Sequence, residues 1–265
     1  MVATVKNADC RVGTTTNGML LNRETIKRVV ESGMDVIAFS LAGTGEENDR
    51  IRKGTRLTKV LVAMRALNEE REKRRMKTPA IHVAYMLFQS GLRNLRNLPG
   101  LLRGCGAADV VISFLDFIPC EELKSEVISP AGKEEYEELQ SLLEEVKEEG
   151  NQHQLSVHHP LESMEKGKEG CTEDVQGCTE NVQRAVCIAS DGSVTPCVYT
   201  NLQVSGASYM PSGGKREYER MVFGNIQERP LKAIWRAKGY SAFRHSFQNE
   251  ALSPTCLACP KLRRG

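Results

Sequence analysis

The chain reads DVIAFSL from Asp35 to Leu41, an almost wholly apolar run. Runs of this length are typical of strands that are covered on both faces, as they are in parallel sheets. After a polar, glycine-containing loop (42–54), apolar residues return at helical spacing between Leu57 and Leu67, which predicts a long amphipathic helix. A strand followed by a helix is the repeating unit of parallel α/β folds.

The same alternation extends to either side of this unit. Short apolar or β-branched runs predict strands over 11–16, 81–88, 110–118 and 154–158. Helical spacing predicts helices between Asn22 and Gly33, over 92–102 and over 133–149. Such alternation implies parallel strands with right-handed crossovers. Because four or five strands do not close an eight-stranded barrel, an open doubly wound sheet and part of an incomplete barrel both fit the pattern.

The composition of the sequence changes after residue 163. Gly, Cys, Asp, Asn and Ser become frequent, and two short apolar runs flank Asp191-Gly192, which predicts a β-hairpin. A short helix is predicted over Pro230–Lys238, because proline is favoured in a first helical turn. We therefore expect an α/β domain over 1–163 and a small α+β domain over 164–265.

Composition narrows the classes of function. The 36 Lys and Arg residues nearly balance 34 Asp and Glu, so bulk charge predicts neither a nucleic-acid nor a membrane partner. No apolar run reaches the ~18 residues of a membrane span, and Met1–Asp9 lack the apolar centre of a secretion signal. These features predict a cytoplasmic protein. Nine cysteines in a reducing compartment favour metal binding or redox chemistry over disulfides.

Four of the cysteines follow a metal-binding pattern. The spacing is Cys178-x13-Gly192-x4-Cys197, followed after a long gap by Cys256-x2-Cys259. The hairpin turn at Gly192 would return the strand that carries Cys197 towards Cys178, and the second pair would complete the set. Four thiolates can hold either zinc or an iron–sulfur cluster, and spacing alone does not separate the two.

The other five cysteines are less informative. Cys187 lies in an apolar strand and Cys171 repeats the local sequence of Cys178, so either could replace Cys178 as a ligand. Cys10, Cys105 and Cys120 are scattered, which is typical of structural or incidental thiols.

Small polar residues lie at the ends of the predicted strands. Ligands of parallel α/β folds bind at the carboxyl ends of the strands, and those ends here carry Thr15, Thr16, Asn17, Ser40, Gly43 and Asp116. The residues fit a small-molecule cleft, although Asn17-Gly18 can equally be a simple turn and Ser40 a satisfied hydroxyl. Arg52 follows the next loop and could reach a carboxylate or a phosphate.

Taken together, these stretches resemble a known family. The runs Thr15–Leu21 and Asp35–Gly43, followed by Arg52-Lys53-Gly54, resemble the middle of a radical SAM enzyme. The tail resembles the auxiliary iron–sulfur domain of the SPASM and Twitch type. The residues that carry this second resemblance are Cys178, Gly192, Val194, Pro196, Cys197, Gly224-Asn225-Ile226, Leu231, Ile234-Trp235 and Cys256–Pro260.

The resemblance implies a partial (β/α)6, TIM-like radical SAM barrel lacking its first strands, followed by the cluster-binding domain. It implies that S-adenosylmethionine and a catalytic 4Fe–4S cluster generate a 5′-deoxyadenosyl radical that abstracts hydrogen from a peptide, a protein or a cofactor precursor. Thr16, Asn17, Ser40 and Arg52 would face the S-adenosylmethionine cleft. One auxiliary 4Fe–4S cluster would bind Cys178, Cys197, Cys256 and Cys259. The electron donor would be a protein such as ferredoxin or flavodoxin.

The sequence departs from the family pattern in two places. The family's Cys-x3-Cys-x2-Cys loop is absent, and the chain begins where a third barrel strand would begin, so we expect the catalytic cluster only in a full-length form. The longer tail pattern has a third cysteine six residues after Cys259, where this chain has Gly265; we therefore expect one auxiliary cluster. The alternative function is a non-catalytic metal-binding module or subunit that recognises a peptide or a partner protein.

Overall fold

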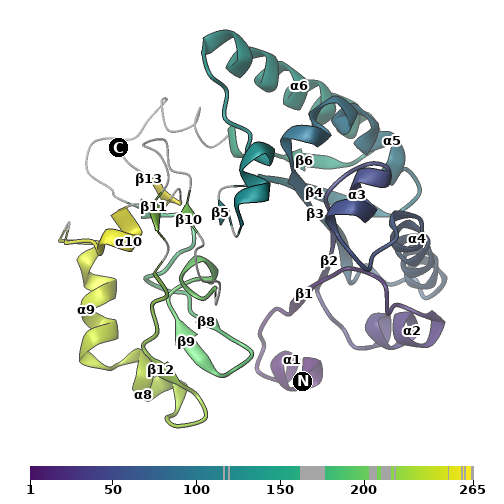
Figure 1. Cartoon of the computed structure of the whole chain (residues 1–265). Helices are drawn as coiled ribbons and strands as arrows, with labels where there is room; N and C mark the ends of the chain where they lie inside the picture. The colour runs from purple at the N-terminus through teal and green to yellow at the C-terminus, as the bar shows by residue number, and fades with distance from the viewer. Residues whose placement is uncertain are drawn as a thin grey trace. The chain divides into compact units, whose positions relative to one another are not determined.

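The computed structural model describes residues 1–115, 117–118, 120–161, 177–202, 208–209, 216–217, 219–249, 251–257, 259 and 261–263. The chain divides into two compact units (Figure 1). Unit 1 comprises Met1–Leu115 and Glu126–Lys166, and unit 2 comprises Asp116–Ser125 and Gly167–Gly265. The boundary predicted between residues 163 and 164 lies outside the described residues.

Unit 1 is built on a parallel sheet of five strands: β1 (Gly13–Thr16), β2 (Val36–Leu41), β3 (Ala80–Leu87), β4 (Ala107–Phe114) and β6 (Ser156–His158). The strands lie side by side in the order β1-β2-β3-β4-β6, which is their order along the chain. A doubly wound sheet reverses its strand order at a switch point, and this sheet does not. The structure therefore excludes the open alternative and confirms a partial TIM-like barrel.

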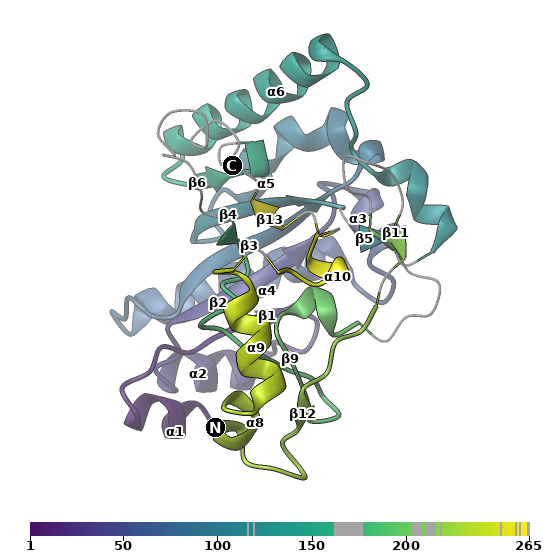
Figure 2. The ribbon, with the colours of Figure 1, turned by 90° about the vertical axis from the view of Figure 1, so that its left-hand side faces the viewer.

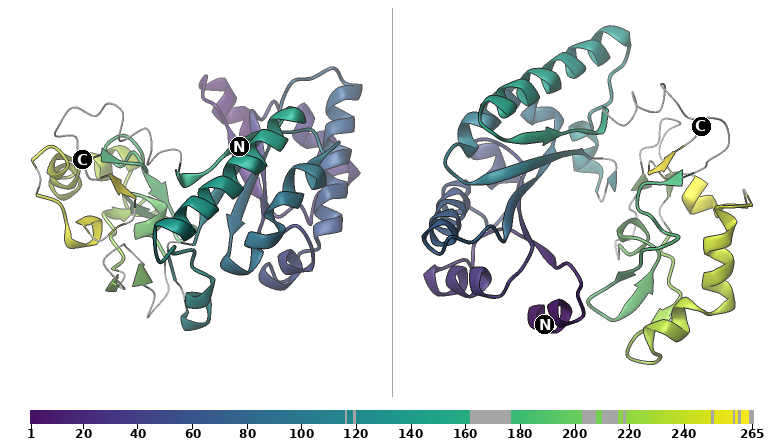
Figure 3. Two further views of the ribbon diagram at one scale, coloured as in Figure 1. Left: turned by 90° about the horizontal axis from the view of Figure 1, so that it is seen from above. Right: turned by 180° about the vertical axis from the view of Figure 1, so that it is seen from behind.

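The helices of unit 1 follow from this topology. Right-handed crossovers that all step in one direction place their helices on one face of the sheet, and α2, α4 and α6 lie on that face (Figure 3). Along β3 the residues Ile81 to Leu87 alternate between buried and half-buried, so one side of the strand packs against the helices. The helical segments of unit 1 are α1 (Val2–Asn7), α2 (Arg23–Glu31), α3 (Glu46–Ile51), α4 (Leu57–Lys73), η1 (Gln89–Asn97), α5 (Leu98–Leu102) and α6 (Lys133–Gln152). The 3-10 helix η2 (Glu121–Glu126) belongs to unit 2 except for its last residue.

Two predicted elements of this region differ from the structure. The helix predicted over 92–102 is a 3-10 helix, η1, that gives way to α5, because Pro99 is accommodated in the first turn of a new helix. The run predicted as one strand over 110–118 is divided. β4 ends at Phe114, and β5 (Phe117–Ile118) pairs with β10 (Ser208–Tyr209) of unit 2. The apolar run is continuous because two different sheets bury its two parts.

Unit 2 is assembled from small antiparallel sheets. β8 (Cys187–Ile188), β9 (Ser193–Thr195) and β12 (Gly224–Asn225) form one of them, which confirms the predicted hairpin at Asp191-Gly192. The other two pair β7 (Gly177–Cys178) with β13 (Leu262–Arg263), and β5 with β10 and β11 (Arg216–Glu217). The remaining elements are η3 (Val198–Thr200), α8 (Leu231–Trp235), α9 (Lys238–Ser246) and α10 (Pro254–Leu257).

The helix predicted over 230–238 is interrupted at Ala237, so that α8 and α9 follow each other along unit 2 (Figure 2). Ile234 and Tyr240 are both fully buried in the core of unit 2. Six residues of continuous helix would turn these side chains about 120° apart, and the interruption lets both face the core. Tyr240 stacks on Phe223 there, with ring centroids 4.3 Å apart.

No helix in the described part of the chain is long and apolar enough to cross a membrane.

Candidate metal centre

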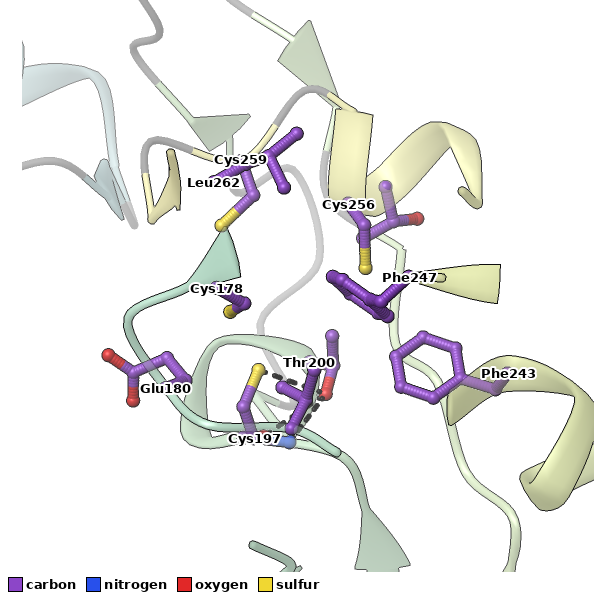
Figure 4. Close-up of a pocket in the computed structure, with 11 residues that line it drawn as sticks. Cys178, Glu180, Cys197, Thr200, Phe243, Phe247, Cys256, Cys259 and Leu262 are labelled. Atoms are coloured by element: carbon purple, nitrogen blue, oxygen red, sulfur yellow. Dashed lines mark hydrogen bonds between the residues drawn. The ribbon is translucent and has the colours of Figure 1, made fainter. Parts of the chain in front are cut away.

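Four cysteines line one cavity of unit 2. Cys178 ends β7, Cys197 precedes η3, Cys256 lies in α10, and Cys259 follows that helix. The four thiols lie around the wall of this cavity (Figure 4). The other lining residues are Glu180, Val182, Thr200, Phe243, Phe247, Thr255 and Leu262. The structure thus brings together the four residues that the spacing singled out.

The hairpin β8–β9 places Cys197. Gly192 has φ +82°, a conformation that glycine adopts without strain, and its amide neighbour Ser193 donates to Asp191 Oδ1 at 2.9 Å. Asn225 Nδ2 donates to the Asp191 carbonyl at 2.8 Å, which fixes the turn to β12. The chain then leaves β9 through Pro196 towards the cavity.

The C-terminal pair is placed by short-range backbone bonds. The amide of Cys256 donates to Ser253 Oγ at 3.3 Å, and the amide of Cys259 donates to the Cys256 carbonyl at 3.1 Å. Leu262 of β13 is the register partner of Cys178 in β7. This antiparallel pairing carries the segment after Cys259 alongside Cys178.

Burial disfavours charge on all four thiols. It raises the pKa of Cys256 to about 11 and the pKa of Cys259 to about 12. Burial also raises the pKa values of Cys178 and Cys197. Bound iron or zinc would have to displace these protons, because the thiolate is the metal ligand.

Hydrogen-bond donors at each sulfur act in the opposite direction. The amides of Glu180 and Val182 lower the pKa of the Cys178 thiol, although burial outweighs them. The Thr200 hydroxyl and amide do the same at Cys197. Ser253 acts on Cys256 and the Lys261 amide on Cys259. Such donors are what a cluster of negative thiolates needs from its surroundings.

The remaining described cysteines lie elsewhere. Cys187 is half-buried outside the cavity wall, and its sulfur accepts from Asn201 Nδ2 at 3.8 Å. Cys10 and Cys120 are exposed, and Cys105 is fully buried in the core of unit 1. Cys171 lies outside the described residues.

The candidate cofactor residues Thr16, Asn17 and Ser40 lie at the carboxyl ends of two neighbouring strands of unit 1. Thr16 pairs in register with Phe39, which is fully buried under the helices. Asn17 and Ser40, one position further along, therefore belong to the opposite face.

Asn17 Oδ1 accepts from the amide of Met19 at 3.1 Å, and Thr16 Oγ1 accepts from the amide of Gly18 at 3.1 Å. The turn is thus held by its own side chains, with Asn17 exposed at the strand end. Of the other strand-end candidates, Asp116 lies outside the described residues.

Arg52 lies at the C-terminal end of α3 and is half-buried. Its carbonyl accepts from the amide and the hydroxyl of Thr55, at 3.0 and 2.7 Å. The buried guanidinium Nε has no hydrogen-bond partner within the described part of the chain, and burial lowers the pKa of Arg52. A buried donor without a partner is costly, and an anionic ligand would satisfy it.

The sequence analysis missed three side chains around the thiols: Glu180, Thr200 and Ser253. Thr200 was recognisable, because Cys197 and Thr200 have the spacing of a capping box at the start of a helix, and the structure forms that box. Glu180 and Ser253 carry no comparable signal, since only the folded chain shows which sulfur each side chain approaches.

Comparisons with known proteins agree with this geometry. Residues 178–260 match the SPASM family, an iron–sulfur cluster-binding domain. The chain is 26% identical over 260 residues to the tungsten-containing aldehyde ferredoxin oxidoreductase cofactor-modifying protein of Pyrococcus furiosus; the match covers 98% of this chain and 68% of that protein.

Two solved structures have a similar fold. SuiB of Streptococcus suis matches with a TM-score of 0.62 and 13% identity, over 97% of this chain and 56% of SuiB. The protein anSMEcpe, solved with bound S-adenosylmethionine and a peptide, matches with a TM-score of 0.55 and 18% identity, over 95% of this chain and 63% of its own. The chain therefore spans little more than half the length of SuiB.

The chain therefore combines a partial barrel, similar in fold to SuiB and anSMEcpe, with a C-terminal stretch that matches an iron–sulfur cluster-binding domain. The chain thus resembles radical SAM proteins that carry a SPASM domain, in fold along most of its length and in sequence over residues 178–260.

Proposed function

We propose that Cys178, Cys197, Cys256 and Cys259 hold one auxiliary 4Fe–4S cluster. The observation that carries the proposal is that these four thiols, from three separate segments, line a single cavity within the stretch that matches the cluster-binding family. Hydrogen-bond donors at every sulfur support it, because they favour the thiolate over the thiol. When bound, the cluster would supply one-electron transfer.

The arrangement favours a cluster over zinc. Zinc draws four sulfurs to about 2.3 Å from one point, whereas a 4Fe–4S cluster takes one thiolate at each of four irons and so keeps the sulfurs apart. In the part of the chain that the structure describes, no three His, Cys, Asp or Glu side chains are placed to hold a single ion. The four sulfurs lie around the cavity wall instead (Figure 4).

Metal and sulfide analysis of the anaerobically reconstituted chain tests this proposal. We expect about four irons and four sulfides per chain, with an electron paramagnetic resonance signal on reduction. One zinc per chain without sulfide would contradict the cluster and favour a structural zinc site on the same cysteines.

We further propose that the carboxyl ends of β1 and β2 hold S-adenosylmethionine. Asn17 and Ser40 would offer polar contacts on one face of the sheet, Thr16 would hold the turn that carries Asn17, and Arg52 would bind the carboxylate of the ligand. The unpartnered guanidinium Nε of Arg52 supports this role, and so do the relatives of the same fold that were solved with S-adenosylmethionine.

Replacement of Arg52 tests the proposed S-adenosylmethionine site. Arg52→Gln should weaken binding by about tenfold, the value of a charged hydrogen bond, as measured by calorimetry on the full chain. Arg56→Gln is the matched control, because Arg56 is 70% exposed and makes only a surface ion pair with Asp49 at 3.7 Å. Equal affinity of the two variants would remove Arg52 from the site.

The activity that fits both sites is radical hydrogen abstraction dependent on S-adenosylmethionine, acting on a peptide, a protein or a cofactor precursor. One relative is named as a cofactor-modifying protein, and SuiB was solved with its precursor peptide SuiA. The catalytic cluster would belong to a full-length form, because these 265 residues contain no Cys-x3-Cys-x2-Cys motif. A ferredoxin or a flavodoxin would donate the electrons.

The same missing motif favours a second candidate function. A chain without a catalytic cluster could be a metal-binding module or subunit that recognises a peptide or a partner protein. The calorimetric experiment separates the two functions, because a binding module of this kind has no use for S-adenosylmethionine and should show no heat of binding.

A further inference from the structure

We propose that Thr200 is a positioning residue whose hydroxyl donates a hydrogen bond to the Cys197 thiolate and thereby raises the reduction potential of the auxiliary cluster. This inference rests on the proposed cluster site. It assigns a role to a side chain that holds no metal itself and that is hydrogen-bonded to Cys197.

Thr200 is placed for this contact by burial and by distance. Its side chain lines the cavity, it is 3% exposed, and its Oγ1 lies 3.5 Å from Cys197 Sγ (Figure 4). The two residues begin and close the single turn of η3, with Cys197 in the N-cap position. The hydrogen bonds of this buried hydroxyl are to the amide, the carbonyl and the sulfur of Cys197.

The Thr200 hydroxyl can give up its hydrogen bond to the Cys197 carbonyl, because that oxygen has other donors. Three donors point at that one oxygen: the Thr200 amide at 3.3 Å, Thr195 Oγ1 at 3.1 Å and Thr200 Oγ1 at 3.0 Å. A carbonyl oxygen has two lone pairs, so one of the three donors is in excess. The Thr200 O–H can therefore turn from the carbonyl to the sulfur by rotating its hydrogen alone, without movement of any heavier atom.

The direction of the bond to sulfur depends on whether iron is bound. A free thiol can donate its S–H to Thr200 Oγ1. A thiolate bound to iron has no proton and can only accept, so the hydroxyl must become the donor. The contact at 3.5 Å would then become a charge-assisted hydrogen bond on a cluster ligand.

Such a bond changes the potential in a defined direction. Reduction adds negative charge to the cluster, and a donor at the sulfur stabilises the more negative state more strongly. Removing the donor must therefore lower the potential. Thr195 offers a matched control, because its fully buried hydroxyl donates to the same carbonyl at 3.1 Å and is not part of the cavity wall.

The test is a redox titration, monitored by electron paramagnetic resonance, of the reconstituted 265-residue chain and its Thr200→Val and Thr195→Val variants. At the midpoint potential of the wild-type chain, Thr200→Val should show a ratio of reduced to oxidised cluster about fivefold lower, the value of one hydrogen bond. Thr195→Val should keep the wild-type midpoint, because the charged thiolate attracts the Thr200 hydroxyl more strongly than the neutral carbonyl does. Thr200→Ser, which retains the hydroxyl, should keep that midpoint as well. The same midpoint in both valine variants, or a higher one in Thr200→Val, would overturn the inference.

Iron content separates this inference from the proposal on which it rests. If the wild-type chain binds no iron, the cluster site and the role of Thr200 both fail. If all variants bind four irons and the midpoints agree, only the role of Thr200 fails. Should Thr200→Val lose its iron, the comparison of Thr200→Ala with Thr200→Ser decides, since the two differ only in the hydroxyl.

Discussion

Cys197→Ala is expected to remove most of the iron and the brown colour from the reconstituted chain. Of the four proposed ligands, Cys197 has the surroundings best suited to a thiolate, because it occupies the N-cap of η3 with the Thr200 hydroxyl and amide beside its sulfur. The substitution deletes one of four thiolates and leaves one iron without a protein ligand, open to water. Iron and sulfide analysis with visible absorbance after desalting would measure the loss.

Cys187→Ala is the matched control for this experiment. Cys187 is half-buried, it lies in the same small sheet that positions Cys197, and its sulfur accepts only a long contact from Asn201. We expect this variant to keep the iron content of the wild-type chain. Full iron content in Cys197→Ala, or its loss in Cys187→Ala, would contradict the ligand set and would make Cys187 a candidate ligand.

The sequence predicted which four thiols come together better than it predicted the residues around them. Cysteine spacing and the hairpin signal at Gly192 are local features of the sequence. They predicted the structure correctly because the conformation of a turn glycine and its neighbours depends little on the rest of the chain. Glu180 and Ser253 each lie within three residues of the thiol on which they act, Cys178 and Cys256, but these two local groups are more than 70 residues apart in sequence, and the pairing of β7 with β13 brings them together. That pairing is only two residues long on each strand, too short for a sequence pattern to reveal.

The barrel shows the same limit. Strand and helix alternation predicted the parallel units, but it could not decide between an open sheet and a partial barrel, since both have the same pattern along the chain. The register of β3, β4 and β6 determines which side chains lie together on the face of the sheet opposite the helices. His82 Nε2 lies 3.1 Å from Asp109 Oδ2 and His158 Nε2 lies 3.3 Å from Asp109 Oδ1. No spacing in the sequence indicates this cluster, because its members come from three different strands.

Gly43→Val is expected to lower the free energy of unfolding of unit 1 by ~3 kcal/mol, the cost of severe overpacking. Gly43 follows β2 at the start of the loop that leads to α3. A Cβ atom there would lie 2.7 Å from the amide nitrogen of Asn48 and would overlap the side chain of Glu47. Neither can yield freely: Asn48 is fully buried with its Oδ1 bonded to the amide of Ala42 at 3.0 Å, and Glu47 accepts from the amide of Thr44 at 2.9 Å.

Urea unfolding followed by two probes would measure the effect. Far-ultraviolet circular dichroism reports the helices, most of which belong to unit 1, whereas fluorescence reports unit 2 through Trp235, the single tryptophan. We expect Gly43→Val to lower the urea midpoint measured by circular dichroism and to leave the midpoint measured by fluorescence in place.

Gly100→Ala is the control, because nothing lies within 4 Å of its added Cβ and alanine is favoured over glycine in the helix α5. Displacement of α3 would also move Arg52, so the valine variant should bind S-adenosylmethionine more weakly. An unchanged circular dichroism midpoint would show that the loop after β2 is looser than its hydrogen bonds indicate, and it would weaken the argument that this loop holds Arg52 in place for a ligand.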